Sequence, residues 1–290
     1  MLGILVVHKP QGLTSHDVVN QVRRKLGTRR VGHAGSLDPM ATGALVLAVG
    51  PATRFLQYLP LEPKIYAGKM TFGIETNTQD AEGEVVATRN VPYDLEAQLL
   101  ELLPGYVGEV HQIAPMFSAV KRDGKPLYAY ARQGIEVERD TRTIYIDEIQ
   151  LLNVEGPTAE FRVVCSGGTY VRTLAHDLGQ DIGCGAHLSA LTRTDVGKFS
   201  LANAVQLEDV AHEHLIPLHE ALPPLQLLQM DAAEEVRIRQ GQTLKISDAM
   251  DMRFVGLLDQ AGRVFAVGRA EKNRLRPECV IPAEALVEVG

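Results

Sequence analysis

The chain has 290 residues, of which 45% are hydrophobic and 22% are charged, the balance of an ordinary soluble globular protein with room for one large and one small domain. No apolar run reaches the roughly 18–20 residues that a membrane-spanning helix needs. The three cysteines, Cys165, Cys184 and Cys279, are far apart and odd in number. Composition therefore argues against a membrane protein, a disulfide-stabilised secreted domain and a cysteine-based zinc site, and we expect a cytoplasmic protein.

The net charge of −7 is distributed unevenly along the chain. Residues 1–55 carry a net charge of +5, which leaves −12 for the remaining 235 residues. Local charge governs affinity for phosphate, so a basic end of this kind is compatible with nucleic-acid binding, although a solvated helix face has the same composition. The basic residues of this end are Lys9, Arg23, Arg24, Lys25, Arg29, Arg30 and Arg54.

Hydrophobic periodicity predicts a mixture of strands and helices in the first half of the chain. Thr14 and Ser15 form a helix cap, apolar residues then recur at helical spacing, and Gly27 ends the helix. The expected elements are strands at residues 4–7, 44–50, 64–73 and 82–91, a helix from Ser15 to Leu26, and a helix from Asp94 to Leu103.

The second half of the chain divides into a continuation of this pattern and a separate β-rich unit. We expect strands at residues 143–153 and 159–165, followed by a helix that begins after Gly168. Residues 111–142 contain few core-type side chains and many Gly, Pro, Arg and Lys, which indicates an excursion from the core. The proline-rich segment 215–224 predicts a linker to short strands at 253–259 and 264–269, joined by a turn. The predicted domains are residues 1–224 and 225–290.

One loop has the composition of a functional site. Residues 30–43 contain three glycines and a proline among small residues, and Asp38 is the only acidic residue between Asp17 and Glu62. We expect nearby cations to keep the Asp38 carboxylate ionised, which suits a nucleophile or a general base. From composition alone, an Asx-turn is the better explanation of Asp38.

Several motifs in this order resemble the TruB family of tRNA pseudouridine-55 synthases. The resemblance spans about residues 1–200, with Ala34, Phe117 and Thr192 standing where the family commonly has other residues. The motifs are Lys9-Pro-Gln-Gly-Leu-Thr-Ser15, Gly32-His-Ala-Gly-Ser-Leu-Asp-Pro-Met-Ala-Thr-Gly43, Lys64-Ile-Tyr66, Pro115-Met-Phe-Ser-Ala-Val-Lys121, Tyr130-Ala-Arg-Gln-Gly134, Ser166-Gly-Gly-Thr-Tyr-Val-Arg-Thr-Leu174 and Gly185-Ala-His-Leu-Ser-Ala-Leu-Thr-Arg193.

The resemblance implies an α+β pseudouridine-synthase fold, in which helices flank a mixed, largely antiparallel sheet. It also implies a small C-terminal PUA-like RNA-binding domain. The implied activity is isomerisation of the uridine at position 55, in the tRNA T loop, after the nucleotide has been flipped out. We expect no cofactor, no metal and no protein partner, only tRNA bound through its T arm by a monomer.

The resemblance also assigns roles to individual residues. Asp38 is the expected nucleophile, and attack on the ribose and on the uracil ring both remain open. Arg172 pairs with this carboxylate, and Tyr66 stacks on the uracil or moves a sugar proton. His33 fills the gap that the extruded nucleotide leaves. The remaining expected substrate contacts are Lys64, Tyr170 and Leu191 in the pocket, and Lys121 and Arg132 in the insertion at 111–142, the thumb of the family.

Two other functions share this scaffold. A non-catalytic tRNA-binding or tRNA-folding protein needs the grip on the RNA but not Asp38. A guided pseudouridine synthase of RNA–protein particles has the core motifs but lacks the insertion at 111–142, which is present here. We rank the stand-alone tRNA enzyme first. His212, His214 and His219 do not have the setting of a metal site and read as a solvated helix end.

Overall fold

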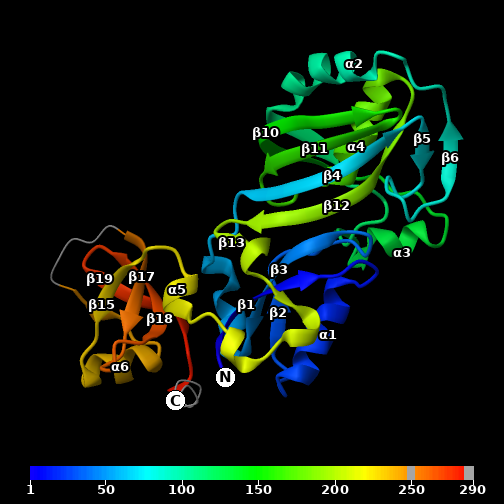
Figure 1. The fold of residues 1–290 in the computed structure, drawn as a ribbon. Helices are drawn as coiled ribbons and strands as arrows, with labels where there is room; N and C mark the ends of the chain where they lie inside the picture. Colours follow the sequence, from blue (N-terminus) through cyan, green and yellow to red (C-terminus); the bar gives the residue numbers. More distant parts are fainter. Residues whose placement is uncertain (247–251, 284–290) are drawn as a thin grey trace.

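In the computed structural model, which describes residues 1–246 and 252–283, the chain folds into a large sheet flanked by helices and a smaller C-terminal sheet (Figure 1). The large sheet contains β1 Gly3–Lys9, β2 Val31–His33, β3 Thr42–Val49, β4 Lys64–Phe72, β7 Gly108–Ile113, β10 Thr141–Glu155, β11 Thr158–Cys165, β12 Ala186–Val196, β13 Phe199–Ser200 and β14 Val205–Gln206. The helices are α1 Ser15–Lys25, α2 Leu95–Leu102, α3 Leu127–Ala131, α4 Val171–Ile182, α5 Leu218–Ala221 and α6 Ala232–Arg239, with short 3-10 turns η1 Gly50–Tyr58, η2 Leu103–Tyr106, η3 Leu201–Asn203, η4 Leu207–Asp209 and η5 His212–His214.

The strand order of the large sheet is β14-β1-β3-β12-β4-β11-β10-β7, with β2 beside β3 and β13 beside β12. The β1–β14 and β3–β12 pairs are parallel and the other pairs are antiparallel. The expectation of an α+β fold with a mixed, largely antiparallel sheet is therefore confirmed.

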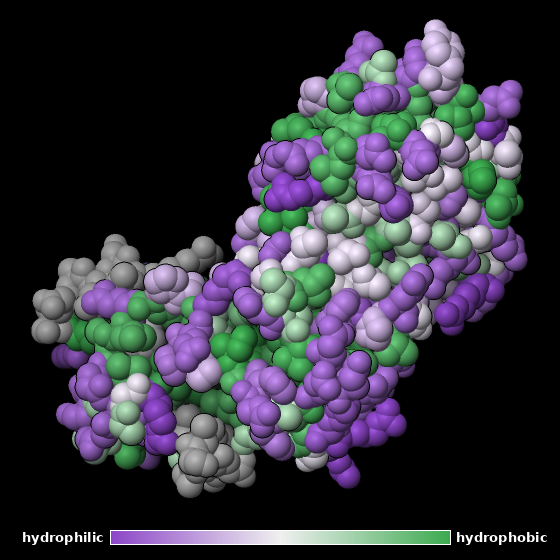
Figure 2. All heavy atoms as spheres, viewed as in Figure 1, coloured by the Kyte–Doolittle hydropathy of each residue, from purple (hydrophilic) through white to green (hydrophobic). Residues whose placement is uncertain are grey.

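Strands β1 and β3 bury both of their faces because their side chains alternate between two apolar layers. Leu5 and Leu47 face one cluster, which α1 covers with Val18, Val19 and Val22. The alternate residues of the two strands face the cluster that contains Phe55 of η1. The outward side of α1 is hydrophilic (Figure 2), as its capping box and basic last turn require in water.

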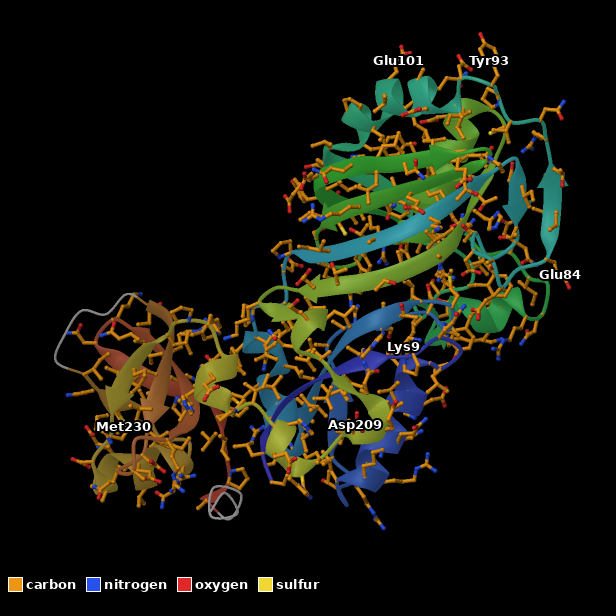
Figure 3. All side chains as sticks on the ribbon, viewed as in Figure 1. Lys9, Glu84, Tyr93, Glu101, Asp209 and Met230 are labelled. Carbon is orange, nitrogen blue, oxygen red and sulfur yellow. The ribbon has the colours of Figure 1, made fainter. Side chains whose placement is uncertain are left out.

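The other half of the sheet is covered by α4 and α2. Leu174 and Leu178 of α4 and Leu99 of α2 pack on the residues of β4, β10, β11 and β12 that point to this side. Gly179 lies against the backbone of Ala186, so no larger residue could let α4 approach β12 so closely. Tyr93, which precedes α2, and Glu101, on α2 itself, extend into solvent (Figure 3).

The segment between β7 and β10 leaves the sheet and returns to it. It contains a two-stranded ribbon, β8 Lys121–Arg122 and β9 Lys125–Pro126, followed by α3. The ribbon β5 Ile74–Thr76 and β6 Val85–Thr88 projects from the end of β4. Residues 111–113 and 141–142, which we expected in the excursion, belong to the paired strands β7 and β10.

The C-terminal sheet has five strands in the order β15-β17-β18-β19-β16, with bounds β15 Gln226–Gln229, β16 Leu244–Lys245, β17 Met252–Leu258, β18 Val264–Glu271 and β19 Arg274–Val280. It shares one hydrophobic cluster with η1 of the large unit. There, the Tyr58 ring meets Phe254 edge-on with 5.1 Å between ring centroids, and Arg54 donates to the carbonyl of Val280. Residues 247–251 and 284–290 of the predicted domain 225–290 lie outside the described residues.

Candidate active site

A cleft of about 700 Å³ opens where the loop before β3, the start of β4, the segment after β7 and the N-terminus of α4 come together. Most of the residues that the sequence analysis proposed for catalysis or substrate binding line this cleft: His33, Asp38, Lys64, Tyr66, Arg132, Tyr170, Arg172 and Leu191. Lys121 does not line it and lies exposed on β8. Segments that are up to about 160 residues apart in the sequence therefore contribute to one site.

The loop that carries Asp38 is held on one side by two buried side chains. The Lys9 ammonium donates to the carbonyl oxygens of Pro10, Leu13 and Pro39 at 2.9, 2.6 and 3.3 Å. The Ser15 hydroxyl accepts from the Leu37 N–H at 2.8 Å. Lys9 is fully buried, and burial lowers its pKa to about 8. Lys9 thus anchors the loop and contributes nothing to the basic surface that we inferred from its charge.

On the other side, Arg193 of β12 holds the same loop. Its guanidinium donates to the carbonyls of Gly35 and Ala44 at 3.2 and 2.8 Å, and the side chain is 1% exposed. Gly43 has a φ of +113°, and a Cβ there would collide with the Arg193 backbone. The glycine of the motif is needed because β3 and β12 approach each other closely at this point.

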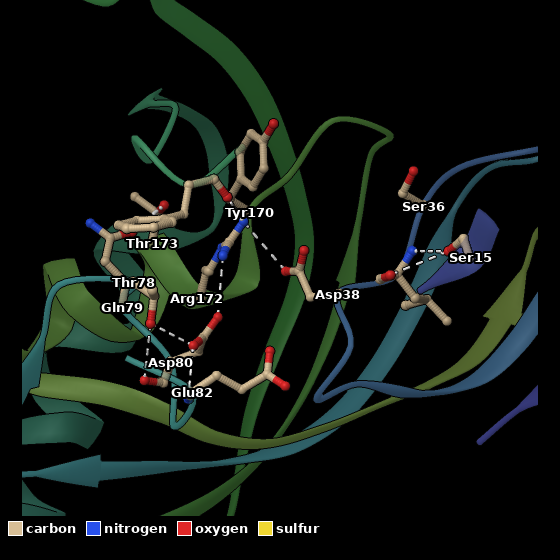
Figure 4. Close-up of polar contacts among 12 residues, drawn as sticks. Ser15, Ser36, Asp38, Thr78, Gln79, Asp80, Glu82, Tyr170, Arg172 and Thr173 are labelled. Carbon is tan, nitrogen blue, oxygen red and sulfur yellow. Dashed lines mark hydrogen bonds and ion pairs between the residues drawn. The ribbon is translucent and has the colours of Figure 1, made fainter. Parts of the chain in front are cut away.

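Asp38 lies in an arginine-centred cluster (Figure 4). The Nη2 atom of Arg172 is 3.5 Å from Asp38 Oδ2, and its Nη1 atom is 3.2 Å from Asp80 Oδ2. The same Nη2 donates to the carbonyl of Phe117 at 2.7 Å. The side chains of Arg172 and Asp80 are only 6% and 3% exposed, whereas that of Asp38 is 42% exposed. Asp38 is therefore the carboxylate that a molecule in the cleft can reach.

Burial raises the pKa of Asp38 above its usual value, with a smaller contribution in the same direction from Asp80. Arg172 and Lys9 oppose this shift. Our expectation that the surrounding cations dominate was wrong. Desolvation is the larger effect, and the charge of Arg172 that opposes it is shared with a second acid, Asp80.

Tyr66, Lys64 and Leu191 come from neighbouring positions on paired strands. Tyr66 of β4 is opposite Arg193 of β12, and Leu191 is opposite Gly68. Burial raises the pKa of Tyr66, so its phenol is neutral in the free protein, and burial lowers the pKa of Lys64. These shifts leave a flat neutral ring beside a cation whose hydration is already partly lost.

Tyr170 is positioned by a residue that the sequence analysis missed. The side-chain amide of Gln112 accepts from the Tyr170 N–H at 3.1 Å and donates to the Tyr170 carbonyl at 3.2 Å. Gln112 is 1% exposed. The Tyr170 ring lies 5.3 Å from the Arg142 guanidinium and 5.8 Å from that of Arg172. This two-bond clamp fixes the start of α4, two residues before Arg172.

Asp80 was also missed, because its segment reads as a polar connection between two strands. Its Oδ1 accepts from the Thr78 hydroxyl at 2.6 Å and from the Glu82 N–H at 3.1 Å. The N–H of Ala81 donates to Leu188 of β12, which ties the segment to the sheet. A run of short polar residues that hydrogen-bond their own backbone was the available signal.

Within residues 1–246 and 252–283, no group of three His, Cys, Asp or Glu side chains has a geometry suited to a metal ion. In the same part of the chain, no helix is long and apolar enough to cross a membrane.

The architecture is that of a pseudouridine synthase. Solved structures with the same fold include an H/ACA RNP bound to a substrate RNA containing 2′-deoxyuridine, with a TM-score of 0.68, 23% identity, and coverage of 97% of this chain and 85% of the other. A Cbf5-Nop10-Gar1 complex has a TM-score of 0.65 and 25% identity over 99% of this chain and 81% of the other.

Sequence comparison defines the family within this class. Residues 23–171 match the TruB family pseudouridylate synthase N-terminal domain, and residues 172–228 match the tRNA pseudouridylate synthase B C-terminal domain. A tRNA pseudouridine synthase B from Burkholderia mallei (strain NCTC 10247) is 43% identical over 96% of each chain. One from Opitutus terrae is 48% identical over 77% of this chain and 95% of the relative. The chain belongs to the TruB family of pseudouridine synthases and is an isomerase, which confirms the resemblance seen in its motifs.

Proposed function

We propose that this enzyme converts the uridine at position 55, in the T loop of tRNA, to pseudouridine, with Asp38 as the nucleophile that attacks a flipped-out nucleotide. Membership of the TruB family and relatives named tRNA pseudouridine synthase B support tRNA as the substrate. The observation that carries the catalytic assignment is the unequal exposure of the two carboxylates that share Arg172. Of these two carboxylates, Asp38 lines the cleft and Asp80 does not, so Asp38 is the one that can form a bond to a nucleoside bound there.

The reaction is an isomerisation without net redox change. The bond from ribose C1′ to uracil N1 breaks, and a bond from C1′ to C5 forms. C5 loses a proton, and N1 gains one. Asp38 can assist by attacking C1′ or the uracil ring, and the ester or adduct breaks down when the new glycosidic bond is made. Both routes need an ionised carboxylate, which the Arg172 guanidinium orients through Oδ2.

The lining of the cleft fits a single nucleotide held away from its stack. Tyr66 and Leu191 provide apolar surface for a uracil ring, and a neutral phenol suits stacking. Lys64 and Arg132 provide positive charge where phosphates would pass. His33 lines the same cleft, and burial lowers its pKa, which favours a neutral ring that can fill the gap left in the RNA stack.

The grip on the T arm is assigned to surfaces outside the cleft. We include in the proposal the basic side chains of the insertion, among them the exposed Lys121 and the half-buried Arg122, which would neutralise backbone phosphates without reading sequence. A second depression, of about 660 Å³, on the C-terminal sheet is suited to the acceptor stem. Its basic lining residues are Arg269, Lys272, Arg274 and Arg276. We propose that a single chain suffices for this recognition.

The test compares the wild type with Asp38→Asn on a T-arm transcript. Asparagine keeps the size of the side chain and removes the nucleophile, so we expect pseudouridine formation to fall by more than about a thousandfold. RNA affinity should stay within about threefold, because the phosphate contacts are unchanged. Pseudouridine at near wild-type rates in the mutant would reject Asp38 as the nucleophile. A wild-type protein that binds the transcript but forms no pseudouridine would favour the tRNA-folding alternative.

A further inference from the structure

Buried polar atoms without partners gather around the cleft. In native proteins such atoms are few, and each one needs an explanation. Among the described residues, three cleft-lining side chains have one: His33 at Nδ1, Arg172 at Nε and Ser118 at Oγ. His33 and Arg172 already have roles in the proposed function. Ser118 has none, although it is 5% exposed and its hydroxyl is closed off from solvent.

Ser118 lies in the insertion, and its backbone is fixed from two sides. The carbonyl of the preceding residue, Phe117, accepts from Arg172 Nη2 at 2.7 Å. The carbonyl of Ser118 itself accepts from the N–H of Tyr128, in α3, at 3.1 Å. Ser118 therefore stands between the reacting centre and the body of the insertion. Its free hydroxyl results neither from an unanchored loop nor from contact with water.

We propose that the Ser118 hydroxyl hydrogen-bonds the nucleoside of the target uridine, at a ribose hydroxyl or a uracil carbonyl, when the nucleotide enters the cleft. This inference rests on the proposed function. The serine side chain has a single rotatable dihedral with three staggered positions, so a rotation about it can turn Oγ into the space that the residue already lines. A hydroxyl both donates and accepts, which matches the polar groups of a nucleoside.

The charges in the cleft favour the nucleoside over a phosphate as the partner. Lys64 and Arg132 line the same cleft and supply the cationic groups that a phosphate selects. Arg132 is exposed, whereas Ser118 is buried next to the Arg172–Asp38 pair. A flipped nucleotide enters base and sugar first and leaves its phosphates at the rim. A buried neutral hydroxyl at this depth meets the sugar or the base.

The Tm of the RNA-free protein distinguishes a substrate-binding role of Ser118 from a purely structural one. A buried hydroxyl without a partner does not stabilise the fold, so its removal leaves the free protein as stable as before or more stable. The same removal deletes one hydrogen bond from the RNA complex. A structural serine behaves differently: its loss lowers Tm and activity together. Ser189 of β12 offers that contrast, because its hydroxyl accepts from Thr71 and donates to the carbonyl of Lys69.

The experiment measures Tm and the kcat/KM for pseudouridine formation on a T-arm transcript, for the full-length wild type, Ser118→Ala and Ser189→Ala. For Ser118→Ala we expect kcat/KM to fall about tenfold with an unchanged or higher Tm. For Ser189→Ala, which lies outside the cleft lining, we expect a lower Tm with unchanged kcat/KM. The inference is overturned if Ser118→Ala stays within twofold of the wild-type kcat/KM, or if its Tm falls in parallel with its activity.

Modified transcripts then identify the bonded group. We measure the affinity of the wild type and of Ser118→Ala for RNA with a 2′-deoxy, 2-thio or 4-thio substitution at the target uridine. Affinity is chosen over reaction rate because it can be measured even for analogues that react slowly. We expect the difference between the two proteins to vanish for one of the three analogues, which names the partner. An undiminished difference for all three would place the contact on the backbone and overturn the nucleoside assignment. Asp38→Asn, assayed on the unmodified transcript, tests the proposed function separately.

Discussion

Asp38 and Asp80 both contact the guanidinium of Arg172, but their loops differ in how far they expose the carboxylate to solvent. The Asp80 loop is closed: its carboxylate is 3% exposed and has Thr78, Glu82 and Arg172 as partners at 3.2 Å or less. The Asp38 loop is open: its carboxylate is 42% exposed, and its ion pair with Arg172 spans 3.5 Å. One aspartate is saturated with hydrogen bonds, and the other keeps oxygen lone pairs available.

The difference shows how a protein can fix an arginine and still leave free lone pairs on the neighbouring carboxylate, which we propose as the nucleophile. A fully bonded Asp38 would be ionised but unreactive, because its lone pairs would all be occupied. Asp80 and the carbonyl of Phe117 hold most of the Arg172 fork instead. Asp38 is oriented by the same Nη2 atom that donates to Phe117, at 3.5 Å, while burial raises the pKa of the carboxylate.

Of the variants that test this comparison, Arg172→Lys should lower the activity most. A single ammonium cannot reach Asp38, Asp80 and the Phe117 carbonyl as the planar fork does, so Asp38 loses its orientation. We expect kcat for pseudouridine formation to fall about a hundredfold. Arg162→Lys is the matched control, since Arg162 makes a surface ion pair with Glu148 outside the cleft. A kcat within threefold of wild type for Arg172→Lys would contradict the fork argument.

Asp80→Asn should have a smaller effect with a distinctive pH signature. The asparagine oxygen can still accept from Thr78 and Glu82, but the charge that holds Arg172 is lost, and we expect kcat to fall about tenfold. Asp80 contributes to the raised pKa of Asp38, so its neutralisation lowers that pKa. The acid limb of the kcat/KM profile should therefore move to lower pH. The profile is measured from pH 4.5 to 8 for both proteins. An acid limb at the same pH in mutant and wild type would mean that Asp80 supports folding and does not affect the pKa of Asp38.

The smallest expected effect is a change in the stability of Asp38→Asn. A carboxylate whose folded-state pKa is raised destabilises the fold above that pKa, and this cost disappears below its unfolded-state value of about 4. The Tm of Asp38→Asn should exceed that of wild type at pH 7 by no more than about 2 °C, because the exposed part of the side chain is screened by water. The gap should close as the pH falls towards 4. The measurement is calorimetry across this pH range. A lower Tm for the mutant than for wild type at pH 7 would contradict the raised pKa of Asp38.

Much of the fold was predictable from local patterns. The Thr14 cap and the valine spacing of α1, the run that forms β3, and the apolar stripe of α4 all lie where periodicity placed them. The central strand β12 was not predicted, because its sequence mixes Ala, Ser, Thr, Arg and Asp without alternation. Strand β12 pairs with β3 on one side and with β4 on the other, and its pairing with β4 has two register shifts. Apolar and polar residues therefore do not alternate along the strand.

The site was predicted only as far as its motifs reached. Asp38, Arg172 and Tyr66 were named because whole motifs surround them, and the structure brings all three to one cleft. Asp80 and Gln112 act through contacts with residues 92 and 58 positions away, which no local pattern encodes. The raised pKa of Asp38 depends on burial, a property of the assembled fold, so charge counting gave the wrong direction.

The contact between η1 and the C-terminal sheet has a consequence for the minimal length of a working enzyme. Phe55, Leu59 and Val196 of the large unit share one cluster with Val255, Leu257 and Phe265. A chain cut after Leu222 would leave this apolar surface uncovered, beneath the same β3 strand that follows the Asp38 loop. The sheet beyond residue 225 thus covers an apolar face of the large unit. We expect the shortened enzyme to precipitate before its affinity for tRNA can be measured.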